Sequence, residues 1–449
     1  MTQEIENENE RPKNWFKDSV IVKLAVIAVL TLLLLIPSSW IQSLITEREN
    51  THETVMNDVS DQWSGSQLIQ GPVLVIPFKK EIRTIDTNKK EHVRLEDQTL
   101  YVLPQNLQIK ADIKTDTLHR GMFKAVVYNS KVAVQGNFGK LELDKLGIDP
   151  ASVQYDKVHL VFSVSDLKGL KSNPVVQISG QNLNAEPTFD AKSPFEKGLQ
   201  VAFTLAKDQE TPFNFNLDLK GSDELSFLHL GKTTDVVVRS NWTTPSFDGR
   251  YLPDDRHVNP TGFDAKWRML YYNRPFPQQW VNDAAKLSDK KAAGDATFGV
   301  KLRLPVDEYQ KTMRTTKYST LIILLTFVSL FFTELIRKQR VHVFNYILIG
   351  GAMVVYYTLL LSFSERLGYT FAYMIASAAT IILISAFTSS LLKNRQMALL
   401  FGFILTTFYG FTFILIQLED LSLMIGSILL FIIISLLMYF SRKINWDKH

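Results

Sequence analysis

The chain has 449 residues, of which 46% are hydrophobic and 21% are charged, and its formal net charge at pH 7 is +4. A charge this small, spread over scattered basic residues, does not indicate a nucleic-acid-binding protein. Cysteine is absent, which excludes disulfides, thiolate metal sites and a cysteine nucleophile.

The N-terminal segment predicts a membrane anchor. Residues 1–18 are polar and predict a cytoplasmic tail. Residues 19–45 contain an apolar run long enough to cross the roughly 30 Å hydrocarbon core of a bilayer. The run lacks a small-x-small cleavage site, so an uncleaved transmembrane helix is favoured over a signal peptide. Apolar side chains at three- and four-residue spacing continue this helix outward to about residue 64.

Residues 46–318 predict a large, mainly β domain with helical stalks. From Val73 onward the hydrophobic period changes to two, and turn clusters separate the apolar runs. The expected strands are 73–82, 93–103, 107–113, 123–134, 157–164, 199–205, 213–219, 235–240, 263–271 and 298–304. Short helices are expected only at 141–146 and 278–285. The absence of long interleaved helices favours an antiparallel sandwich or two packed antiparallel sheets.

The last third of the chain predicts membrane helices. A helix expected at 307–317, after Pro305, runs unbroken into a span at 318–336. Four more spans are expected at about 343–363, 371–392, 398–417 and 421–440. Residues 319–441 are therefore a five-helix transmembrane bundle, and residues 442–449 are a tail. The fold class is an α+β membrane protein with six transmembrane helices, one N-terminal and five C-terminal.

Charge in the turns predicts the orientation. Basic residues precede the first span and fill the turns at 337–340 and 393–395 and the tail at 442–443. The alternate turns, near Glu365 and Glu419, are not basic. Because cytoplasmic turns carry the excess of Lys and Arg, both termini are expected in the cytoplasm and residues 46–318 outside it.

Eight separated motifs form an ordered set along the chain. They are GPVLVIP (71–77), YVLP (101–104), RGMFKAVVY (120–128), SDLKG (165–169), SFDGRYLPDDR (246–256), NRPFPQQW (273–280), PVDEYQKTMRTTKY (305–318) and FFTELIRKQRVHVFNYILIG (331–350). With the expected topology, this set resembles the CreD family of bacterial inner-membrane, cell-envelope integrity proteins. SDLKG departs from the SDLRG associated with the family. The resemblance implies an inner-membrane protein that is tied to envelope stress, with residues 46–318 in the periplasm, in a family often controlled by a two-component system. It implies no catalytic activity or active site.

No catalytic or metal-binding motif stands out. The eight histidines show no i, i+2 or i, i+4 spacing, and neither HExxH nor a GxSxG elbow occurs. We therefore assign no catalytic residue, metal or cofactor, and we expect a protein that is not an enzyme.

A membrane-turn cluster is the first candidate site. Glu334 lies about one turn inside the end of a span, where an unpaired carboxylate is costly. It either pairs with Arg337 or Lys338 on its own helix or joins His342 and Asn345 in a cluster that docks a partner or holds the bundle. At the other end of the next span, Glu365 either braces the external domain or has no role.

An aromatic and arginine-rich region between 242 and 280 is the second candidate. The residues expected to bind a glycan, peptide or lipid headgroup are Arg250, Arg256, Trp267, Arg274 and Trp280. The competing interpretation is a domain core with a membrane-facing rim, because aromatic side chains bury large areas wherever they lie.

The leading hypothesis is a non-catalytic envelope-integrity or stress-response protein that couples a periplasmic domain to the membrane or to partners. A transporter or lipid-handling protein is the alternative, and it requires a polar cavity lined by Thr326, Ser329, Ser377 and Thr380. No charge lies near the middle of a span, which counts against ion-coupled transport. A membrane-bound envelope hydrolase is the second alternative and requires facing carboxylates near 248–256. The expected partners are the lipid bilayer and envelope proteins or cell-wall components, and the oligomeric state is left open.

Overall fold

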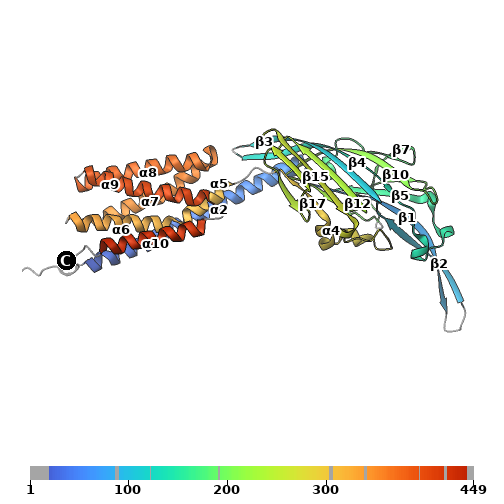
Figure 1. Ribbon diagram of the computed structural model, residues 1–449, viewed down its shortest axis with the longest axis horizontal. Helices are drawn as coiled ribbons and strands as arrows, with labels where there is room; N and C mark the ends of the chain where they lie inside the picture. Colours follow the sequence, from blue (N-terminus) through green and yellow to red (C-terminus); the bar gives the residue numbers. More distant parts are fainter. Residues whose placement is uncertain are drawn as a thin grey trace, which may run out of the picture. The chain divides into compact units, whose positions relative to one another are not determined.

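The computed structural model describes residues 20–85, 91–121, 123–190, 193–302, 307–337, 341–393, 395–418 and 422–441. The chain divides into two compact units. We call Met1–His52 with Val306–His449 the helical unit, and Glu53–Pro305 the β unit. Figure 1 shows helices in the first unit and mainly strands in the second, and each is described by itself below.

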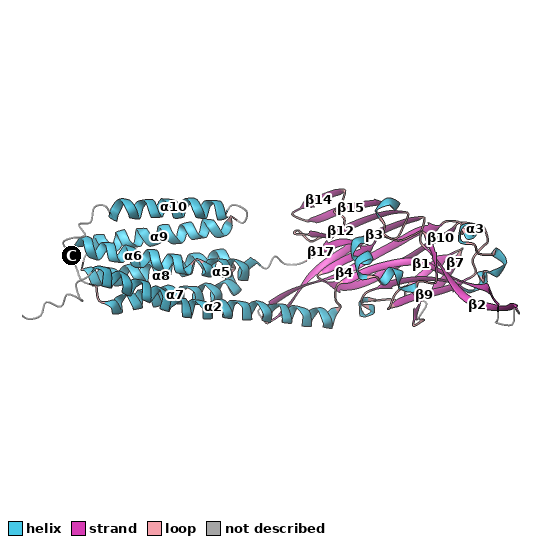
Figure 2. Ribbon diagram, turned by 90° about the horizontal axis from the view of Figure 1, so that it is seen from below, coloured by secondary structure: helices cyan, strands magenta, loops and turns pink. Residues whose placement is uncertain are grey.

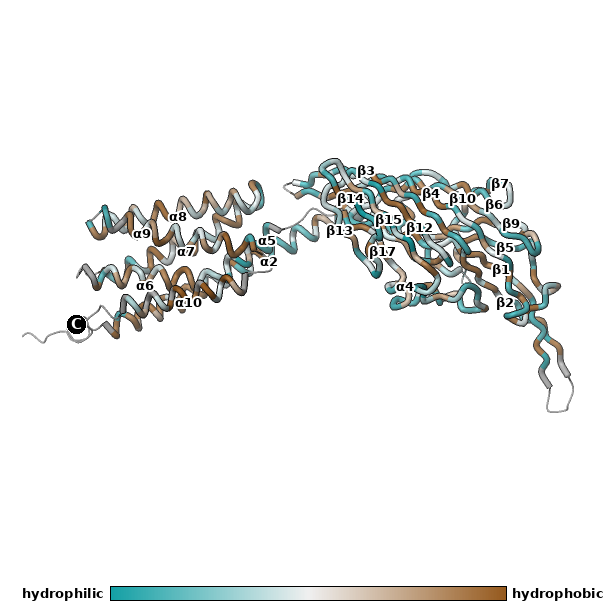
Figure 3. The backbone as a smooth tube through the Cα atoms, in the orientation of Figure 1, coloured by the Kyte–Doolittle hydropathy of each residue, from teal (hydrophilic) through white to brown (hydrophobic). Residues whose placement is uncertain are grey.

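The helical unit is built from long apolar helices. They are α2 (Val20–Trp63, whose last turns belong to the β unit), α5 (Asp307–Lys317), α6 (Ser319–Arg337), α7 (Val343–Leu367), α8 (Tyr369–Leu392), α9 (Arg395–Gln417) and α10 (Ser422–Ser441). Among the described residues, four helices are long and apolar enough to cross a membrane, and the bent pair α5–α6 makes a fifth candidate. Figure 3 shows the apolar residues that run along these helices. The length and composition of these helices are those of a membrane protein.

Close helix packing in this unit depends on small and aromatic residues. A Cβ added to Gly350 of α7 would collide with the side chain of Leu34 of α2, so the glycine lets the two helices approach. Between α7, α8 and α9, the rings of Tyr356 and Tyr409 lie 4.8 Å apart, and the Tyr373 hydroxyl donates to the Tyr409 carbonyl at 2.7 Å. A buried aromatic cluster thus joins these three helices.

The expected unbroken helix from residue 307 into the second span is wrong. Helices α5 and α6 meet at Tyr318 with a bend of 42°. Just before the bend, the Thr315 and Thr316 hydroxyls donate to the carbonyls of Lys311 and Thr312. Hydroxyls that bond the carbonyl four residues back commonly bend helices, and this accounts for the break.

The β unit contains two sheets (Figure 2). The nine-stranded sheet consists of β13 (Ser246–Gly249), β17 (Thr297–Lys301), β11 (Glu224–Leu228), β1 (Gln67–Ile85), β5 (Val158–Val164), β9 (Gly198–Phe203) and β8 (Glu186–Thr188) in that order, with β2 (Glu91–Val102) pairing both β1 and β16 (Gln279–Val281). The eight-stranded sheet has the order β14 (Asp255–Asn259), β15 (Gly262–Leu270), β12 (Thr233–Ser240), β3 (Asn106–Arg120), β4 (Phe123–Phe138), β10 (Thr211–Ser222), β6 (Val175–Ile178) and β7 (Gln181–Asn184). Two short α-helices, α3 (Leu143–Leu146) and α4 (Lys290–Ala296), and five single-turn helices, η1 (Pro150–Ser152), η2 (Tyr155–Lys157), η3 (Leu167–Gly169), η4 (Tyr271–Asn273) and η5 (Ala284–Ser288), lie between the strands.

The two sheets share one hydrophobic core. Side chains alternate along β3 between buried and exposed, so one face is apolar and the other polar. Phe162 of β5 stacks on Phe215 of β10 with ring centroids 4.5 Å apart, and Trp267 of β15 lies 5.7 Å from Phe298 of β17. These contacts join the inner faces of the two sheets, as expected for a sandwich.

The pairing of strands corrects the expectation of purely antiparallel sheets. All ten expected strands are present, but β1 pairs with β11, and β12 with β3, in parallel. In each case more than 100 residues separate the two partners, which leaves room for the crossover that parallel pairing requires. Strands of three to five residues, such as β8, β14 and β16, were too short to give a period-two pattern.

The helix expected at 278–285 is also wrong. Its first half is β16, where Trp280 pairs with Tyr101 of β2 and stacks on its ring at 5.3 Å. Asn282 then has a φ of 63°, which ends the strand, and η5 follows. Cross-strand aromatic pairing outweighs the local helical pattern here. The other short helix, expected at 141–146, is present as α3.

Candidate functional site

A buried carboxylate joins three helices near one end of the helical unit. Glu334 of α6 is 5% exposed, and one of its oxygens accepts from the Lys23 ammonium of α2. Its second oxygen accepts from the Tyr346 hydroxyl of α7 at 3.3 Å. The Tyr346 ring lies edge-on to Phe327 at 5.5 Å, which fixes the hydroxyl beside the carboxylate. Because a charge in the membrane is stable only when paired, this contact ties α2, α6 and α7 together.

A cavity of about 230 Å³ adjoins this ion pair. Its wall is mainly apolar, with Val22, Ile27, Val341 and Val343 among the lining residues, and Glu334 contributes polar atoms to it. An ion pair in an apolar surrounding is poorly screened, so loss of either partner is costly. We call Lys23, Glu334 and Tyr346 the triad.

A second polar contact lies further along α7. The Tyr309 hydroxyl of α5 donates to Glu365 of α7 at 3.0 Å, and the ring of His52 on α2 lies 6.0 Å from the Tyr309 ring. Thus α2, α5 and α7 meet at this point. We call Tyr309, Glu365 and His52 the outer contact.

The triad and the outer contact are separated by about the thickness of a bilayer core. Tyr346 and Glu365 are nineteen residues apart on the uninterrupted helix α7. At a rise of 1.5 Å per residue they lie about 28 Å apart, against roughly 30 Å of hydrocarbon. Each polar group can therefore lie near one membrane interface while the apolar segment between them spans the lipid.

The end of α2 is held within the β unit by a third polar network. Asp166 accepts from the Ser64 hydroxyl at 2.9 Å and from the Gly65 amide at 3.2 Å. The Gln67 side-chain amide donates to Ser64, to the Asp166 carbonyl and to the Lys220 carbonyl. Burial alone raises the pKa of Asp166, but the hydrogen bonds from Gly65, Ser64 and the Lys168 amide outweigh it and hold the pKa below its usual value. We call Ser64, Gln67 and Asp166 the joint.

Comparison with known proteins identifies the family of this chain. The sequence model described as "Inner membrane protein CreD" matches residues 19–447, which is nearly the whole chain. The chain belongs to the CreD family. A relative described as "Inner membrane protein CreD" from Escherichia coli (strain K12) is 29% identical over 426 residues, covering 92% of this chain and 91% of the relative. The resemblance seen in the eight motifs is thereby confirmed.

In this CreD-family chain the described contacts of the predicted membrane-turn cluster are as follows. Glu334 pairs with Lys23, a residue of another helix. The His342 side chain accepts from the Phe344 amide and caps α7, and the Asn345 amide donates to the His342 carbonyl. The side chain of Arg337, and Lys338 as a whole, lie outside the described residues.

The predicted external site is divided between buried and exposed residues. Trp267 belongs to the core between the sheets, and Trp280 to a second cluster with Tyr101. Arg274 is 7% exposed, whereas Arg250 and Arg256 are exposed at the surface. The two tryptophans therefore do not present one common surface with the exposed arginines.

Arg274 instead connects two of the family motifs. Its guanidinium donates to the Phe276 and Leu230 carbonyls and to the Gln278 side chain. Gln278 donates in turn to the carbonyls of Leu103 and Pro104, in the YVLP motif. Burial lowers the pKa of Arg274 to about 10, so the group stays charged at neutral pH. This arginine fixes the NRPFPQQW loop to the end of β2.

Sequence reasoning missed Lys23, Tyr346 and Tyr309 as members of these sites. Lys23 is the one charge within the N-terminal apolar run, and Glu334 is the one acidic residue within the second span. Two unlike charges at the same predicted membrane depth are a usable signal for pairing. Nothing in the sequence pattern marks the two tyrosines, because aromatic residues are frequent throughout the spans.

Proposed function

We propose that this protein is a non-catalytic inner-membrane component that maintains cell-envelope integrity by coupling its β unit to its membrane helices through α2. The family and its E. coli member are both described as inner membrane proteins, which supports the inner-membrane location. The bilayer is then its first partner, and envelope proteins or cell-wall components are the expected others.

The continuity of α2 is the observation that carries this proposal. Helix α2 has 44 residues, from Val20 to Trp63, with Pro37 inside it, and is about 66 Å long at 1.5 Å per residue. Near its start, Lys23 is bound in the triad, and immediately after its end, Ser64 is bound in the joint. A helix held near both ends by part-buried polar contacts can transmit a displacement that a flexible linker would absorb.

The proposed topology has six membrane helices, both termini in the cytoplasm and the β unit in the periplasm. The basic turns at 337–340 and 393–395 support it. The native chain has no cysteine, so single cysteines are clean probes. We expect Lys110→Cys, exposed on β3, to react with an impermeant maleimide in cells with a permeabilised outer membrane, and Lys393→Cys to react only after lysis. The reverse pattern would contradict the topology.

The coupling is tested by breaking α2 at Glu53, an exposed residue ten positions before its end at Trp63. Glu53→Pro removes one helical hydrogen bond and costs about 3 kcal/mol, whereas Glu53→Ala preserves the helix. In cells that lack the native protein and show an envelope defect, the alanine variant should restore exclusion of an impermeant dye and the proline variant should not. Equal restoration by both variants, at equal membrane abundance, would refute coupling through α2.

A transporter or lipid-handling protein is the second candidate, favoured by inward-facing hydroxyls. Thr326, Ser377 and Thr380 are buried in the helical unit, and Ser329 is half-buried. The Thr326 and Ser329 hydroxyls donate to carbonyls one turn back in α6, so neither requires a polar ligand. If a Thr326→Val variant restores dye exclusion as fully as the native chain, the Thr326 hydroxyl is not needed for function, which would weigh against this candidate.

The carboxylates that a hydrolase would need are held by separate partners. Asp248 pairs with Lys301, and Asp255 pairs with Lys266 at 3.0 Å. Asp254 accepts from the Arg268 amide at 2.7 Å. Each of these three acids is therefore bound to a partner of its own, which favours a non-catalytic function.

A further inference from the structure

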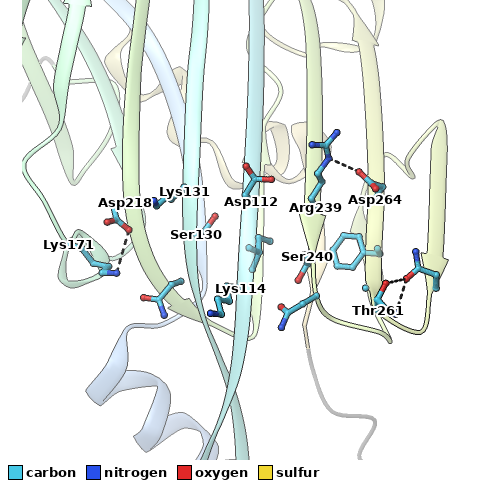
Figure 4. A pocket seen from close by; sticks show the side chains of 16 residues that line it. Asp112, Lys114, Ser130, Lys131, Lys171, Asp218, Arg239, Ser240, Thr261 and Asp264 are labelled. Carbon is cyan, nitrogen blue, oxygen red and sulfur yellow. Dashed lines mark hydrogen bonds and ion pairs between the residues drawn. The ribbon is translucent and has the colours of Figure 1, made fainter.

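A polar groove crosses the outer face of the eight-stranded sheet. It has a volume of about 550 Å³ and is lined by side chains of β3, β4, β10, β12 and β15 together with the turn between β14 and β15. Figure 4 shows its side chains projecting from neighbouring strands on one face. This volume lies within the range of small-molecule and short-peptide sites.

One row of this groove alternates in charge from strand to strand. Asp218 of β10 is opposite Lys131 of β4, which is opposite Asp112 of β3. Asp112 is in register with Arg239 of β12, and Arg239 with Asp264 of β15. Lys171 lies beside Asp218 and extends the row by one more positive charge. Neighbouring strands are about 4.8 Å apart, so the row presents positive and negative charges at a regular spacing.

The ends of the row are paired and its centre is not. Lys171 pairs with Asp218 at 3.7 Å, and Arg239 pairs with Asp264 at 2.9 Å (Figure 4). Within the part of the chain that the structure describes, the side chains of Asp112, Lys131 and Lys114 form no ion pair or hydrogen bond. Lys114 is the next outward-facing residue of β3 after Asp112, about 7 Å further along the strand. The centre of the groove therefore presents a free carboxylate beside free ammonium groups.

The lining residues restrict the class of ligand. Sugars are usually bound on exposed aromatic rings, but the one aromatic residue of the groove, Phe263, is 3% exposed. A lipid needs an apolar surface for its chains, and the apolar lining residues Ile113 and Phe263 are both buried. Positive and negative side chains alternate along the row, so a ligand with charges of one sign only would be repelled as well as attracted. A ligand that carries both charges, with an amide group for Asn129 to bond, fits this lining, whereas the Asn241 side chain is already bonded to Thr115.

We propose that this groove binds a short peptide with free termini, whose ammonium group is bound by Asp112 and whose carboxylate is bound by Lys114 and Lys131. An extended chain advances about 3.4 Å per residue, so a dipeptide matches the separation of about 7 Å between Asp112 and Lys114. The inference goes beyond coupling through α2 and does not depend on it.

The test uses the full chain in an uncharged detergent and measures binding of dialanine by titration calorimetry. Three further ligands are N-acetyl-dialanine, dialanine amide and the doubly blocked peptide. A charged hydrogen bond contributes about 1.5 kcal/mol or more, so blocking either end should weaken binding about tenfold. Asp112→Asn should weaken dialanine about tenfold and leave N-acetyl-dialanine unchanged. Lys114→Gln should also weaken dialanine about tenfold, and it should leave binding of dialanine amide unchanged.

A matched control lies on the same strand. Lys110 faces outward two residues before Asp112 and does not line the groove, so Lys110→Gln should bind dialanine like the native chain. The proposal is overturned if all four peptides bind equally, if dialanine does not bind at about 10 mM, or if Lys110→Gln weakens binding as much as Asp112→Asn. Binding of phosphatidylethanolamine vesicles that depends on Asp112, without binding of dialanine, would also overturn it. Circular dichroism of each variant confirms that the sheet is intact.

Discussion

Lys23 and Glu334 lie 311 residues apart in the sequence and form an ion pair between α2 and α6. The two partners differ in environment, because the side chain of Lys23 is 33% exposed and that of Glu334 only 6%. Among the described residues, removing the lysine would leave the buried carboxylate with only the Tyr346 hydroxyl, whereas removing the acid would leave an ammonium group that can reach water. This asymmetry makes the contribution of the pair measurable.

We expect Lys23→Met to destabilise the helical unit by about 3 kcal/mol and Glu334→Gln by about half as much. The double variant should be more stable than Lys23→Met, because it removes both charges. Thermal unfolding in detergent, followed by the near-ultraviolet signal of the buried tyrosines, measures the differences. Thr333→Val, next to Glu334 but bonded only to its own helix, serves as the control. Equal losses of stability for the two single variants would show that the burial of Glu334 does not determine the cost of breaking the pair.

Sequence reasoning located the buried acid but not its partner. Spacing of three or four residues favoured Arg337 and Lys338, because a helix brings such neighbours together. The contact with Lys23 depends on the packing of α2 against α6, which a linear pattern does not encode. The packing itself needs Gly350, where α2 approaches α7 closely, and such helix contacts are specified by shape more than by period.

Substitution by lysine should destabilise the β unit strongly at Arg274 and hardly at all at Arg256, two arginines of the predicted external site. Arg274→Lys should cost about 2 to 3 kcal/mol, because a lysine cannot satisfy three acceptors held by one planar guanidinium. Arg256→Lys, at the exposed edge strand β14, should change stability by less than about 0.5 kcal/mol. The unfolding midpoint in urea reports both values. A loss at Arg256 comparable to that at Arg274 would indicate that the exposed arginine has a structural partner.

The sequence pattern predicted most of the strands, but it predicted only that two packed sheets form and not the order of strands within them. Alternation of apolar and polar residues specifies which face of a strand is buried, as in β3 and β10, whatever the pairing. Which strand lies next to which depends on contacts distant in the sequence, such as the parallel pairing of Thr233 with Asn106. Gly71 illustrates the limit, since its φ of +101° and a Cβ position 2.9 Å from the Phe162 Cα explain the glycine only once β1 is placed beside β5.

The stability of the β unit should fall in mild acid because of one buried histidine. His229 is fully buried, and burial, with a smaller effect of the Arg274 charge, lowers its pKa to about 4. Its Nε2 donates to the Leu270 carbonyl at 3.3 Å, so its Nδ1 accepts from the Thr234 hydroxyl at 3.0 Å and the ring is neutral. The unfolded chain binds a proton below about pH 6.5 and the folded chain does not, so stability declines as the pH falls from about 6.5 to 4.

This decline predicts an unfolding temperature about 5 to 10 °C lower at pH 4.5 than at pH 7, in addition to the effect of the carboxylates. His229→Gln should be less stable at pH 7 but should lose this part of the pH dependence. His257→Gln, at an exposed position on β14, should retain it. If His229→Gln showed the same pH dependence as the native chain, the histidine would be protonated in the folded state.

The joint at the end of α2 should be more sensitive to neutralisation than the ion pair beside it. Asp166→Asn replaces a carboxylate that accepts from Ser64, Gly65 and Lys168, and we expect it to cost about 2 kcal/mol. Asp58→Asn removes only an exposed pair with Arg120 at 3.9 Å and should cost less than about 0.5 kcal/mol. Because the pKa of Asp166 lies below its usual value, the carboxylate is charged and its contribution to stability is complete above about pH 4. The difference in stability between the two variants should therefore be constant from there to neutral pH.

Hydrogen exchange at the Gly65 amide measures the stability of the joint directly, since that amide donates to Asp166. Faster exchange in Asp166→Asn and native-like exchange in Asp58→Asn is the expected result, and the opposite order would show that the exposed pair, and not the joint, holds the end of the helix.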